Sequence, residues 1–528
     1  MIKLSRRQAL KFFASTAPLL AARPGLAFFD DPIALTKGPF KGTKESLANY
    51  KVPDWFGDAK FGIWSHWGPQ SGIEHGDWYA RKMYMEGGEA YKWHIANFGH
   101  PSKVGYKDLV PQFKAAKWDP EHLMDLYVKA GAKYFFSMGV HHDNFDMWNS
   151  KYQPRWNAVA TGPKRDIVAE WAKAARSRGL KFGVSEHLSN SFEWLAPSHL
   201  SDTTGPLAGV PYDGSNPAYA DLYHDYSDMG PGFAERIQKD AMGRKDAPTR
   251  WKLNYFRRVK DLVDQHKPDL LYTDGGIPFE EYGMSTIAEL YNVSASQHES
   301  NQAVYFGKNR NECKSGTCTL DRERGVLDAI SPEPWQTDTC VGNWHYARNT
   351  HYKSAKKVID LMVDIVSKNG NLLLNFPLPN SGELDADELV TLAGITEWMS
   401  VNGEGIYSTR PWKVNGEGPA SKVVIASNGK EFDPNERNKP DLGAADFRFT
   451  TKNSKLYIFA QGYVGSDKEY VVESLATRSA LKPGKIANVV VLGSDEKLKW
   501  NQDETGLHIS NPKKQLPAPG CCFRISFV

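Results

Sequence analysis

Between about residues 55 and 400, short apolar runs alternate with longer segments of helical periodicity. The apolar runs predict strands over Lys60–Trp67, Ala132–His141, Leu180–His187, Asp269–Asp274, Ala303–Lys308 and Asn371–Phe376. The longer segments predict helices over Pro120–Ala130, Arg165–Arg178, Arg250–His266 and Ser354–Ser367. In Arg250–His266 the apolar residues recur every three or four positions, as on one face of a helix. Strands that alternate with helices indicate βα units and a parallel sheet.

Nearly every predicted strand ends in polar residues that could carry chemistry. These strand ends read Ser65-His66-Trp67, His141-His142-Asp143, Glu186-His187, Asp274-Gly275 and Asn309-Arg310. In a (β/α) barrel the active site gathers at the carboxyl ends of strands all around the ring, whereas an open sheet concentrates ligands at one switch point. We therefore predict an α/β fold with a TIM-like (β/α) barrel over residues 29–404.

After about residue 405 the pattern changes to short β-rich runs separated by Gly, Asp, Asn and Lys. No helical period of useful length is present there, which predicts a C-terminal antiparallel β-sandwich over residues 405–528. Within the barrel region, Ser201–Lys245 is rich in Gly, Pro, Asp and Tyr and is expected to be an inserted loop. The predicted C-terminal strands are Lys422–Ala426, Lys455–Gln461, Tyr470–Glu473, Ala487–Leu492 and Cys522–Val528.

Composition and charge exclude several classes of protein. The 65 basic and 62 acidic residues nearly balance, so nothing in the net charge of +3 indicates binding to nucleic acid or to an anionic membrane. The sequence has no P-loop, no dinucleotide-binding fingerprint and no G-x-S-x-G nucleophile elbow. No apolar run beyond the N-terminal segment reaches 18 residues, so we expect no membrane association once that segment is removed.

Residues 1–28 are typical of an export signal. Arg6-Arg7 precede a short apolar stretch that begins at Phe12, and a zone of small residues ends near Ala27. The paired arginines indicate a twin-arginine-type signal, which predicts a periplasmic or secreted protein; the alternative is an amphipathic helix. In an oxidising compartment Cys313 and Cys318 are close enough in sequence to form a disulfide.

Asp274 is the leading candidate for a catalytic carboxylate. It closes an apolar strand and is followed by Gly275, whose lack of a side chain allows close approach of a substrate. The alternative for an isolated Asp at this place is a capping residue in a βα loop. Hydrolysis of a glycosidic bond with retention needs a second carboxyl group as acid and base. Glu323 and Glu333 both lie downstream, and spacing alone does not choose between them.

Histidines at three strand ends suggest sugar binding, because neutral imidazoles donate hydrogen bonds to hydroxyls and nearby indoles offer stacking faces. The competing interpretation is a zinc site that also includes Asp143 and Asp274. No helical metal-binding spacing supports it, and adjacent residues of a strand point to opposite sides. We therefore expect neither a metal nor another cofactor. The residues concerned are His66, His141, His142 and His187, with Trp67, Trp78 and Trp148 as the indoles.

Five motifs together resemble the glycoside hydrolase family 29 of α-L-fucosidases across about residues 54–400. The resemblance implies a barrel followed by a β-sandwich, and a retaining exo-α-L-fucosidase that needs no cofactor and acts on fucosylated oligo- or polysaccharides. The motifs are Lys60–Gly68, Asp77-Trp78-Tyr79, His141–Phe145, Trp335-Gln336-Thr337 and Trp344-His345-Tyr346.

The resemblance also assigns roles to single residues. It makes Asp274 the nucleophile and, because the family acid/base follows the substrate-binding arginine by about a dozen residues, it favours Glu323 over Glu333. Arg310 would be that arginine, and Trp344 would lie against the apolar face of the sugar. The residues implied to contact the fucose hydroxyls are His66, Asp77, Trp78, His141 and His142.

Several positions depart from the family pattern. Asp77 stands in place of a usual Glu, Asn144 in place of a Gly, Gln336 in place of a Glu, and Ser185-Glu186-His187 in place of a tyrosine-rich strand end. These departures keep three alternatives open: a glycosidase for a related L-sugar (an α-L-galactoside or a sulfated fucose unit), a non-catalytic sugar-binding barrel, and a metal-dependent hydrolase. The sequence is also compatible with an oligomer.

Overall fold

The computed structural model describes residues 33–230, 232–239, 243–423 and 435–528. The predicted export signal at 1–28 and most of the predicted strand Lys422–Ala426 lie outside these residues. Residues Leu35–Val528 form one compact unit. In the described part of the chain, no helix combines the length and the apolar character that crossing a membrane requires.

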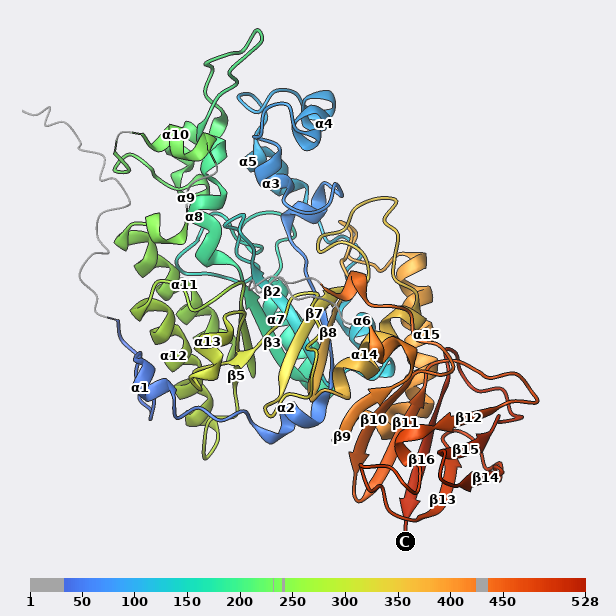
Figure 1. Cartoon of the computed structure of the whole chain (residues 1–528). Coiled ribbons are helices and arrows are strands. Elements are labelled where there is room, and N and C mark those ends of the chain that lie inside the picture. Colours follow the sequence, from blue (N-terminus) through green and yellow to red (C-terminus); the bar gives the residue numbers. More distant parts are fainter. Residues whose placement is uncertain (1–32, 231, 240–242, 424–434) are drawn as a thin grey trace, which may run out of the picture. The chain divides into compact units, whose positions relative to one another are not determined.

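Eight parallel strands form a barrel (Figure 1), in the order β6-β5-β4-β3-β2-β1-β8-β7. The ring closes between its two outer strands, where Asp321 forms a parallel bridge with Gln336 and the Arg322 N–H donates to the Gln336 carbonyl (2.9 Å). The strands are β1 Phe61–Ser65, β2 Tyr134–Val140, β3 Lys181–Glu186, β4 Leu270–Thr273, β5 Val304–Gly307, β6 Thr319–Leu320, β7 Trp335–Cys340 and β8 Gly370–Asn375.

All six strands predicted in the barrel region are confirmed, but two strands were not predicted. β6 has only two residues, too few for any pattern. β7 is polar along most of its length, Trp-Gln-Thr-Asp-Thr-Cys, although it is buried throughout. Its polar residues find partners inside the fold: Thr337 donates to the Arg322 carbonyl (2.7 Å) and Gln336 donates to Asp321 (2.9 Å). Hydrophobic patterning cannot detect a strand whose buried side chains are satisfied by hydrogen bonds.

The four predicted helices are confirmed as α6 Pro120–Lys129, α7 Ile167–Ser177, α11 Thr249–His266 and α14 Ala355–Val366. Asp119 caps α6 as expected and accepts from the His122 N–H (3.0 Å). Two long helices were missed: α12 Glu281–Gln297, which is buried on several sides, and α15 Ala386–Asn402. The other α-helices are α1 Lys44–Leu47, α2 Asp54–Ala59, α3 Tyr79–Lys82, α4 Glu89–Phe98, α5 Tyr106–Leu109, α8 Ser191–Trp194, α9 Ala220–Tyr223, α10 Phe233–Gln238 and α13 Arg310–Lys314.

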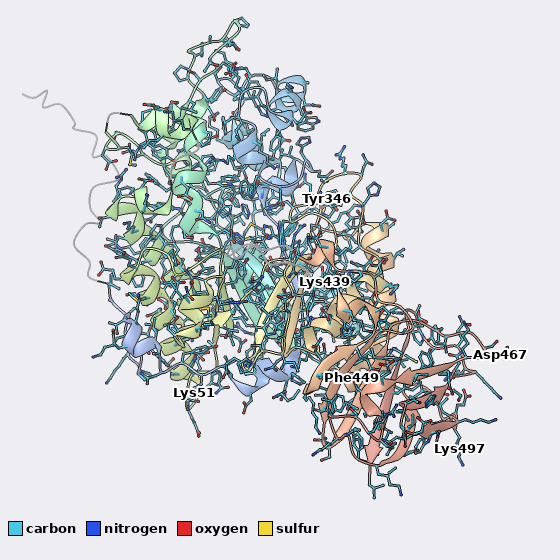
Figure 2. The ribbon with its side chains drawn as sticks, in the orientation of Figure 1. Lys51, Tyr346, Lys439, Phe449, Asp467 and Lys497 are labelled. Atoms are coloured by element: carbon cyan, nitrogen blue, oxygen red, sulfur yellow. A yellow bond between two sulfur atoms is a disulfide. The ribbon has the colours of Figure 1, made fainter. Side chains whose placement is uncertain are left out.

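The C-terminal region consists of two antiparallel sheets, with strand orders β13-β16-β11-β10-β9 and β12-β15-β14. Apolar residues of both sheets share one core, which includes Phe449 (Figure 2), Tyr470 and Ile509. This is the predicted sandwich. The strands are β9 Arg410–Glu417, β10 Phe447–Lys452, β11 Lys455–Ala460, β12 Glu469–Val472, β13 Ile486–Val491, β14 Trp500–Gln502, β15 Leu507–Ser510 and β16 Cys521–Phe527.

The segment after β2 is held by a fully buried arginine on α11. Arg258 forms an ion pair with Asp146 in which both side chains are 0% exposed, and it also donates to the Asn144 side chain. Asn144 has φ 64°, a left-handed conformation that glycine adopts freely and that Asn tolerates. The Asn144 amide donates to the carbonyls of Asp221 and Leu222 (3.1 and 2.8 Å). The buried contacts of Asn144 explain how it can replace the glycine of the family pattern.

Replacing Arg258 with Met should destabilise the protein by about 3 kcal/mol or more, because it leaves Asp146 buried without its partner. The measurement is the free energy of unfolding in urea. Arg410→Met is the control, since the Arg410–Asp58 pair is almost half exposed (48% and 42%) and its loss should cost about 1 kcal/mol or less. Equal losses in the two variants would contradict the anchoring role of Arg258.

Candidate active site

A pocket of about 280 Å³ opens at the carboxyl ends of the barrel strands. Most of its lining residues lie on or just after the strands, as the strand-end pattern predicted, and the others come from the segments that follow β1, β6 and β7. They are Trp64, His66, Asp77, Trp78, Lys82, His141, His142, His187, Tyr272, Asp274, Lys308, Glu323, Asp338 and Trp344.

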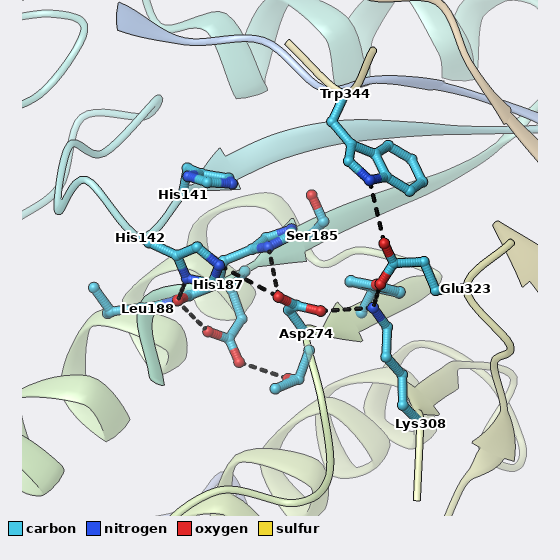
Figure 3. Close-up of polar contacts among 12 residues, drawn as sticks. His141, His142, Ser185, His187, Leu188, Asp274, Lys308, Glu323 and Trp344 are labelled. Carbon is cyan, nitrogen blue, oxygen red and sulfur yellow. Dashed lines mark hydrogen bonds and ion pairs between the residues drawn. The ribbon is translucent and has the colours of Figure 1, made fainter. Parts of the chain in front are cut away.

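Asp274 follows β4 directly and is contacted from two sides (Figure 3). Its Oδ1 accepts from Lys308 Nζ at 2.7 Å. Its Oδ2 lies 3.3 Å from His142 Nε2 and 3.4 Å from His187 Nδ1. The His142 ring is oriented by its Nδ1, which donates to the His187 carbonyl at 2.8 Å. One carboxylate is thus held by a cation and two imidazoles, which leaves it fixed and charged.

Lys308 also contacts Glu323, the second carboxyl group of the pocket (Figure 3). The other oxygen of Glu323, Oε1, accepts from the Trp344 indole N–H at 3.2 Å. Because one Nζ touches Asp274 and Glu323 at 2.7 Å or less, the two contacting oxygens are no more than about 5.4 Å apart. Retaining glycosidases have their carboxyl groups about 5–5.5 Å apart and inverting ones about 6.5–9.5 Å. This bound on the nearest oxygens is shorter than the separation in inverting enzymes and compatible with that in retaining ones.

The surroundings push the pKa values of the two carboxyl groups in opposite directions. Burial raises the pKa of Asp274, but the Lys308 charge and the hydrogen bonds from His142 and His187 outweigh it and hold that pKa well below its usual range. Burial also raises the pKa of Glu323, and the nearby charges of Asp338 and Asp274 add to this against the opposing effect of Lys308. Near neutral pH Asp274 is therefore the ionised group, and Glu323 is the one better able to carry a proton.

A second pair of carboxyl groups lies buried beside this site. Burial raises the pKa of Asp338 well above its usual range, and the neighbouring Asp321 raises it further. Burial likewise raises the pKa of Asp321, to about 6. Tyr272 donates to Asp338 (3.2 Å), and Gln336 donates to Asp321 (2.9 Å). Gln336 is one of the departures from the family pattern, and an amide here avoids adding another negative charge.

Three histidines of the pocket, His66, His141 and His187, are neutral at pH 7. Burial and the charges of neighbouring rings hold the pKa of His66 and of His141 well below the usual range. Burial lowers the pKa of His187 to about 4, although Asp274 opposes the shift. A neutral imidazole has one donor and one acceptor nitrogen, which suits the hydroxyl groups of a sugar.

His141 and His142 do not point to opposite sides, contrary to expectation. β2 ends at Val140, so the alternation of a strand no longer applies to them, and both rings line the pocket with centroids 4.4 Å apart. One ring nitrogen each of His66, His141 and His345 lie within 4.8 Å of one another, as do one each of His141, His142 and His187. Either group could offer three ligands to a metal, so metal dependence is a point for experiment.

Asp77 is held by a residue that strand-end reasoning missed. Its Oδ1 accepts from both the backbone N–H and the ring Nδ1 of His345, at 3.1 and 2.8 Å. The shorter side chain at this departure from the family pattern is thus fixed by a second segment of the chain. In the sequence, only the Trp344-His345-Tyr346 motif indicated that His345 belongs to the site.

Of the indoles offered as stacking faces, Trp78 and Trp344 line the pocket, and Trp78 is 44% exposed. Trp67 and Trp148 belong instead to the core, where their N–H groups donate to the Pro379 carbonyl (3.0 Å) and to Asp261 (3.0 Å). An indole with a buried hydrogen-bond partner packs the barrel and is not available to a substrate.

The structure places Lys308, not Arg310, in the pocket. β5 ends at Gly307, so Lys308 is the first residue past the strand, just as Asp274 is past β4. Arg310 begins α13, is exposed and is not among the residues that line the pocket, so its expected role in substrate binding stays a prediction. Glu333 is also exposed and precedes β7, at the end of the strand opposite to the pocket. Of the two candidate glutamates, Glu323 shares both the pocket and the Lys308 contact with Asp274, and Glu333 shares neither.

A β/α barrel with two carboxyl groups at retaining distance in a pocket of aromatic and imidazole side chains defines a glycoside hydrolase of the retaining class. A sequence model of the alpha-L-fucosidase family matches residues 28–404. The chain therefore belongs to the α-L-fucosidase family.

Curated relatives agree with this assignment, and a solved structure shares the fold. Tissue alpha-L-fucosidase of Homo sapiens is 28% identical over 89% of this chain and 87% of its own length, and that of Rattus norvegicus is 27% identical over 90% and 88%. The crystal structure of Thermotoga maritima alpha-fucosidase in complex with fucose is similar with a TM-score of 0.67 and 24% identity, over 92% of this chain and 100% of that one.

Lys308→Met should lower kcat/KM for an aryl α-L-fucoside by about 100-fold, because a preorganised charge at the reacting groups is lost. Lys308 lowers the pKa of Asp274, so its removal should also move the acid limb of the pH–rate profile to higher pH. Arg310→Ala should leave both the rate and the profile unchanged. An effect of Arg310→Ala as large as that of Lys308→Met would contradict this placement.

Proposed function

We propose that the protein is an exo-acting retaining α-L-fucosidase that hydrolyses terminal α-L-fucose from oligo- or polysaccharides. Membership of the α-L-fucosidase family supports the choice of sugar. The single observation that carries the mechanism is the shared contact of Lys308 with Asp274 and Glu323, which sets two carboxyl groups at the distance of a double displacement. The small volume of the pocket suits one terminal sugar.

In the first step, Asp274 attacks the anomeric carbon while Glu323 donates its proton to the glycosidic oxygen. The C–O bond to the rest of the glycan breaks, and a glycosyl ester forms on Asp274. In the second step, Glu323 accepts a proton from water, which attacks the anomeric carbon, breaks its bond to Asp274 and releases the sugar and the Asp274 carboxylate. Lys308 holds both side chains in place through both steps, and it favours the ionised form of Asp274.

A related L-sugar is the second candidate substrate, namely an α-L-galactoside or a sulfated fucose unit. Two features favour such a sugar. The short side chain of Asp77 is turned to His345. Lys82 lines the pocket and donates to the Asp77 carbonyl (3.0 Å). An ammonium group at the rim of the pocket is a partner for a sulfate group.

We also propose that the protein is exported by a twin-arginine-type signal and acts in the periplasm or outside the cell. The paired Arg6-Arg7 before an apolar stretch supports this proposal. The disulfide between Cys313 and Cys318 adds to it, because disulfides persist in oxidising compartments.

Asp274→Asn should keep the fold and lower turnover of 4-nitrophenyl α-L-fucoside by about four orders of magnitude, because an amide cannot form the glycosyl ester. Release of 4-nitrophenol is measured beside the α-L-galactoside and with a chelator present. Activity that the chelator abolishes would favour a metal-dependent hydrolase. A wild-type protein that binds fucosides without turnover would favour a non-catalytic sugar-binding barrel.

Glu323→Ala should slow hydrolysis by about 100-fold for fucosides with poor leaving groups and much less for activated aryl fucosides, which need little protonation. It should also remove the alkaline limb of the pH–rate profile, since Glu323 is the protonated group. Glu333→Ala is the matched control and should behave like wild type. If Glu333→Ala shows these effects and Glu323→Ala behaves like wild type, Glu333 is the acid/base.

A further inference from the structure

A second hollow, the α4 groove, lies next to the catalytic pocket and has a volume of about 670 Å³. Its aromatic part is built from Trp93 and Phe98 of α4, together with His75, whose ring stacks on Trp93 at 4.3 Å. Asn97 and the ion pair between Arg348 and Glu74 (2.7 Å) supply its polar part. Half-buried aromatic rings beside a few fixed polar groups are typical of a binding site for a ligand of mixed character.

The wall between the pocket and the groove is a short two-stranded ribbon made of residues 74–78 and 344–348. His75 and Ala347 form an antiparallel bridge, the Gly76 N–H donates to the Tyr346 carbonyl (3.2 Å), and the Arg348 N–H donates to the Glu74 carbonyl (3.2 Å). Tyr346 is labelled in Figure 2. The same ribbon carries residues of the catalytic pocket, which are Asp77, Trp78 and Trp344.

The ribbon runs away from the side of the pocket where the general acid, Glu323, lies. The general acid must lie next to the oxygen of the leaving group, so the rest of the glycan extends from the side of Glu323. Trp344 touches that side, because its indole donates to Glu323 (3.2 Å). From Trp344 the chain reaches Arg348 in four residues, a Cα path of at most about 14 Å. The groove is therefore within reach of a glycan chain whose terminal sugar occupies the pocket.

Two residues of the ribbon, Glu74 and Trp78, have left-handed backbone conformations. Glu74 and Trp78 have φ of 56° and 64°, left-handed values that are costly for residues with a side chain. Glu74 is held by Arg348 and by the Asn380 N–H (3.3 Å), and it faces the groove, while Trp78 faces the pocket. Such strain persists where the surroundings hold it, and it gathers at functional sites.

The charges of the groove balance. Arg348 and Glu74 cancel each other, and burial lowers the pKa of His75, with the Lys82 charge adding to the shift, so the ring is neutral at pH 7. A paired guanidinium and carboxylate still offer free donor and acceptor positions to hydroxyl groups. The ligand that matches is rich in hydroxyls, has apolar ring faces and bears no charge.

We infer that the α4 groove binds the sugar units beyond the fucose, so that the substrate is a neutral fucosylated chain extending from Glu323 across Trp344 to Trp93 and Arg348. This inference rests on the proposed fucosidase activity. The terminal sugar then occupies the catalytic pocket while the following units stack on Trp93 and exchange hydrogen bonds with Arg348, Glu74 and Asn97.

The test compares Trp93→Ala and Arg348→Ala with wild type on three substrates: 4-nitrophenyl α-L-fucoside, a fucosyl disaccharide, and a neutral fucosylated oligosaccharide with at least three units beyond the fucose. Both variants should lose about five-fold or more in kcat/KM on the long substrate and change less than about two-fold on the other two. Arg478→Ala is the matched control, because Arg478 is 70% exposed and pairs with Glu504, much as Arg348 is 76% exposed and pairs with Glu74. It should leave all three rates unchanged.

Equal losses on all three substrates, or none on the long one, would overturn the inference. A wild-type protein that hydrolyses no fucoside would refute the proposed activity instead. The groove is then tested by calorimetry with the defucosylated oligosaccharide, whose Kd should rise about five-fold or more in Trp93→Ala. Unchanged binding in that variant would overturn the inference by itself. A sulfated chain that is bound or cleaved better than the neutral one would overturn the assignment of a neutral ligand.

Discussion

One ammonium group organises this active site. Lys308 contacts both Asp274, the nucleophile, and Glu323, the acid and base. Asp274 and Glu323 stand close enough that both could not ionise easily without a cation between them. Lys308 is buried and has four acidic neighbours, which raise its pKa well above the usual range although burial alone would lower it. The lysine therefore stays charged and holds the two carboxyl groups together. The imidazoles beside Asp274 and the negative charges near Glu323 then decide which of the two is ionised.

The barrel makes this contact geometrically simple. Asp274 and Lys308 each directly follow a strand, on β4 and its neighbour β5, and Glu323 follows β6, the next strand of the ring. Parallel neighbours in a barrel bring their carboxyl ends together, so three residues far apart in sequence meet without any special loop. The disulfide between Cys313 and Cys318 links α13 to the segment that enters β6.

The departures from the family pattern are accompanied by new partners. Asp77 is shorter than the usual Glu, and His345 meets it with two hydrogen bonds. Asn144 adopts the left-handed conformation of the usual glycine and is fixed by the buried Arg258. Gln336 donates to Asp321 and accepts from the Tyr134 hydroxyl (3.0 Å), and an ionised carboxylate could not make this pairing because it has no proton to donate to Asp321. The pocket thus differs from the family pattern in detail while the two reacting groups keep their places.

The sequence by itself determined the alternation of strands and helices, the chemistry at the strand ends, the sandwich and the family, because periodicity and residue identity are local properties. It also identified Asp274, since a carboxylate at the tip of an apolar strand is visible in the chain. The family resemblance favoured Glu323 over Glu333, and only the tertiary structure brought Glu323 into the pocket with Lys308, left Arg310 outside it, placed His141 beside His142, and paired His345 with Asp77. Those outcomes depend on where a strand ends to within one residue and on contacts between segments more than 200 residues apart, such as Asp77 and His345. Local patterns carry no information about such contacts, because the energy that decides them arises only when the barrel closes.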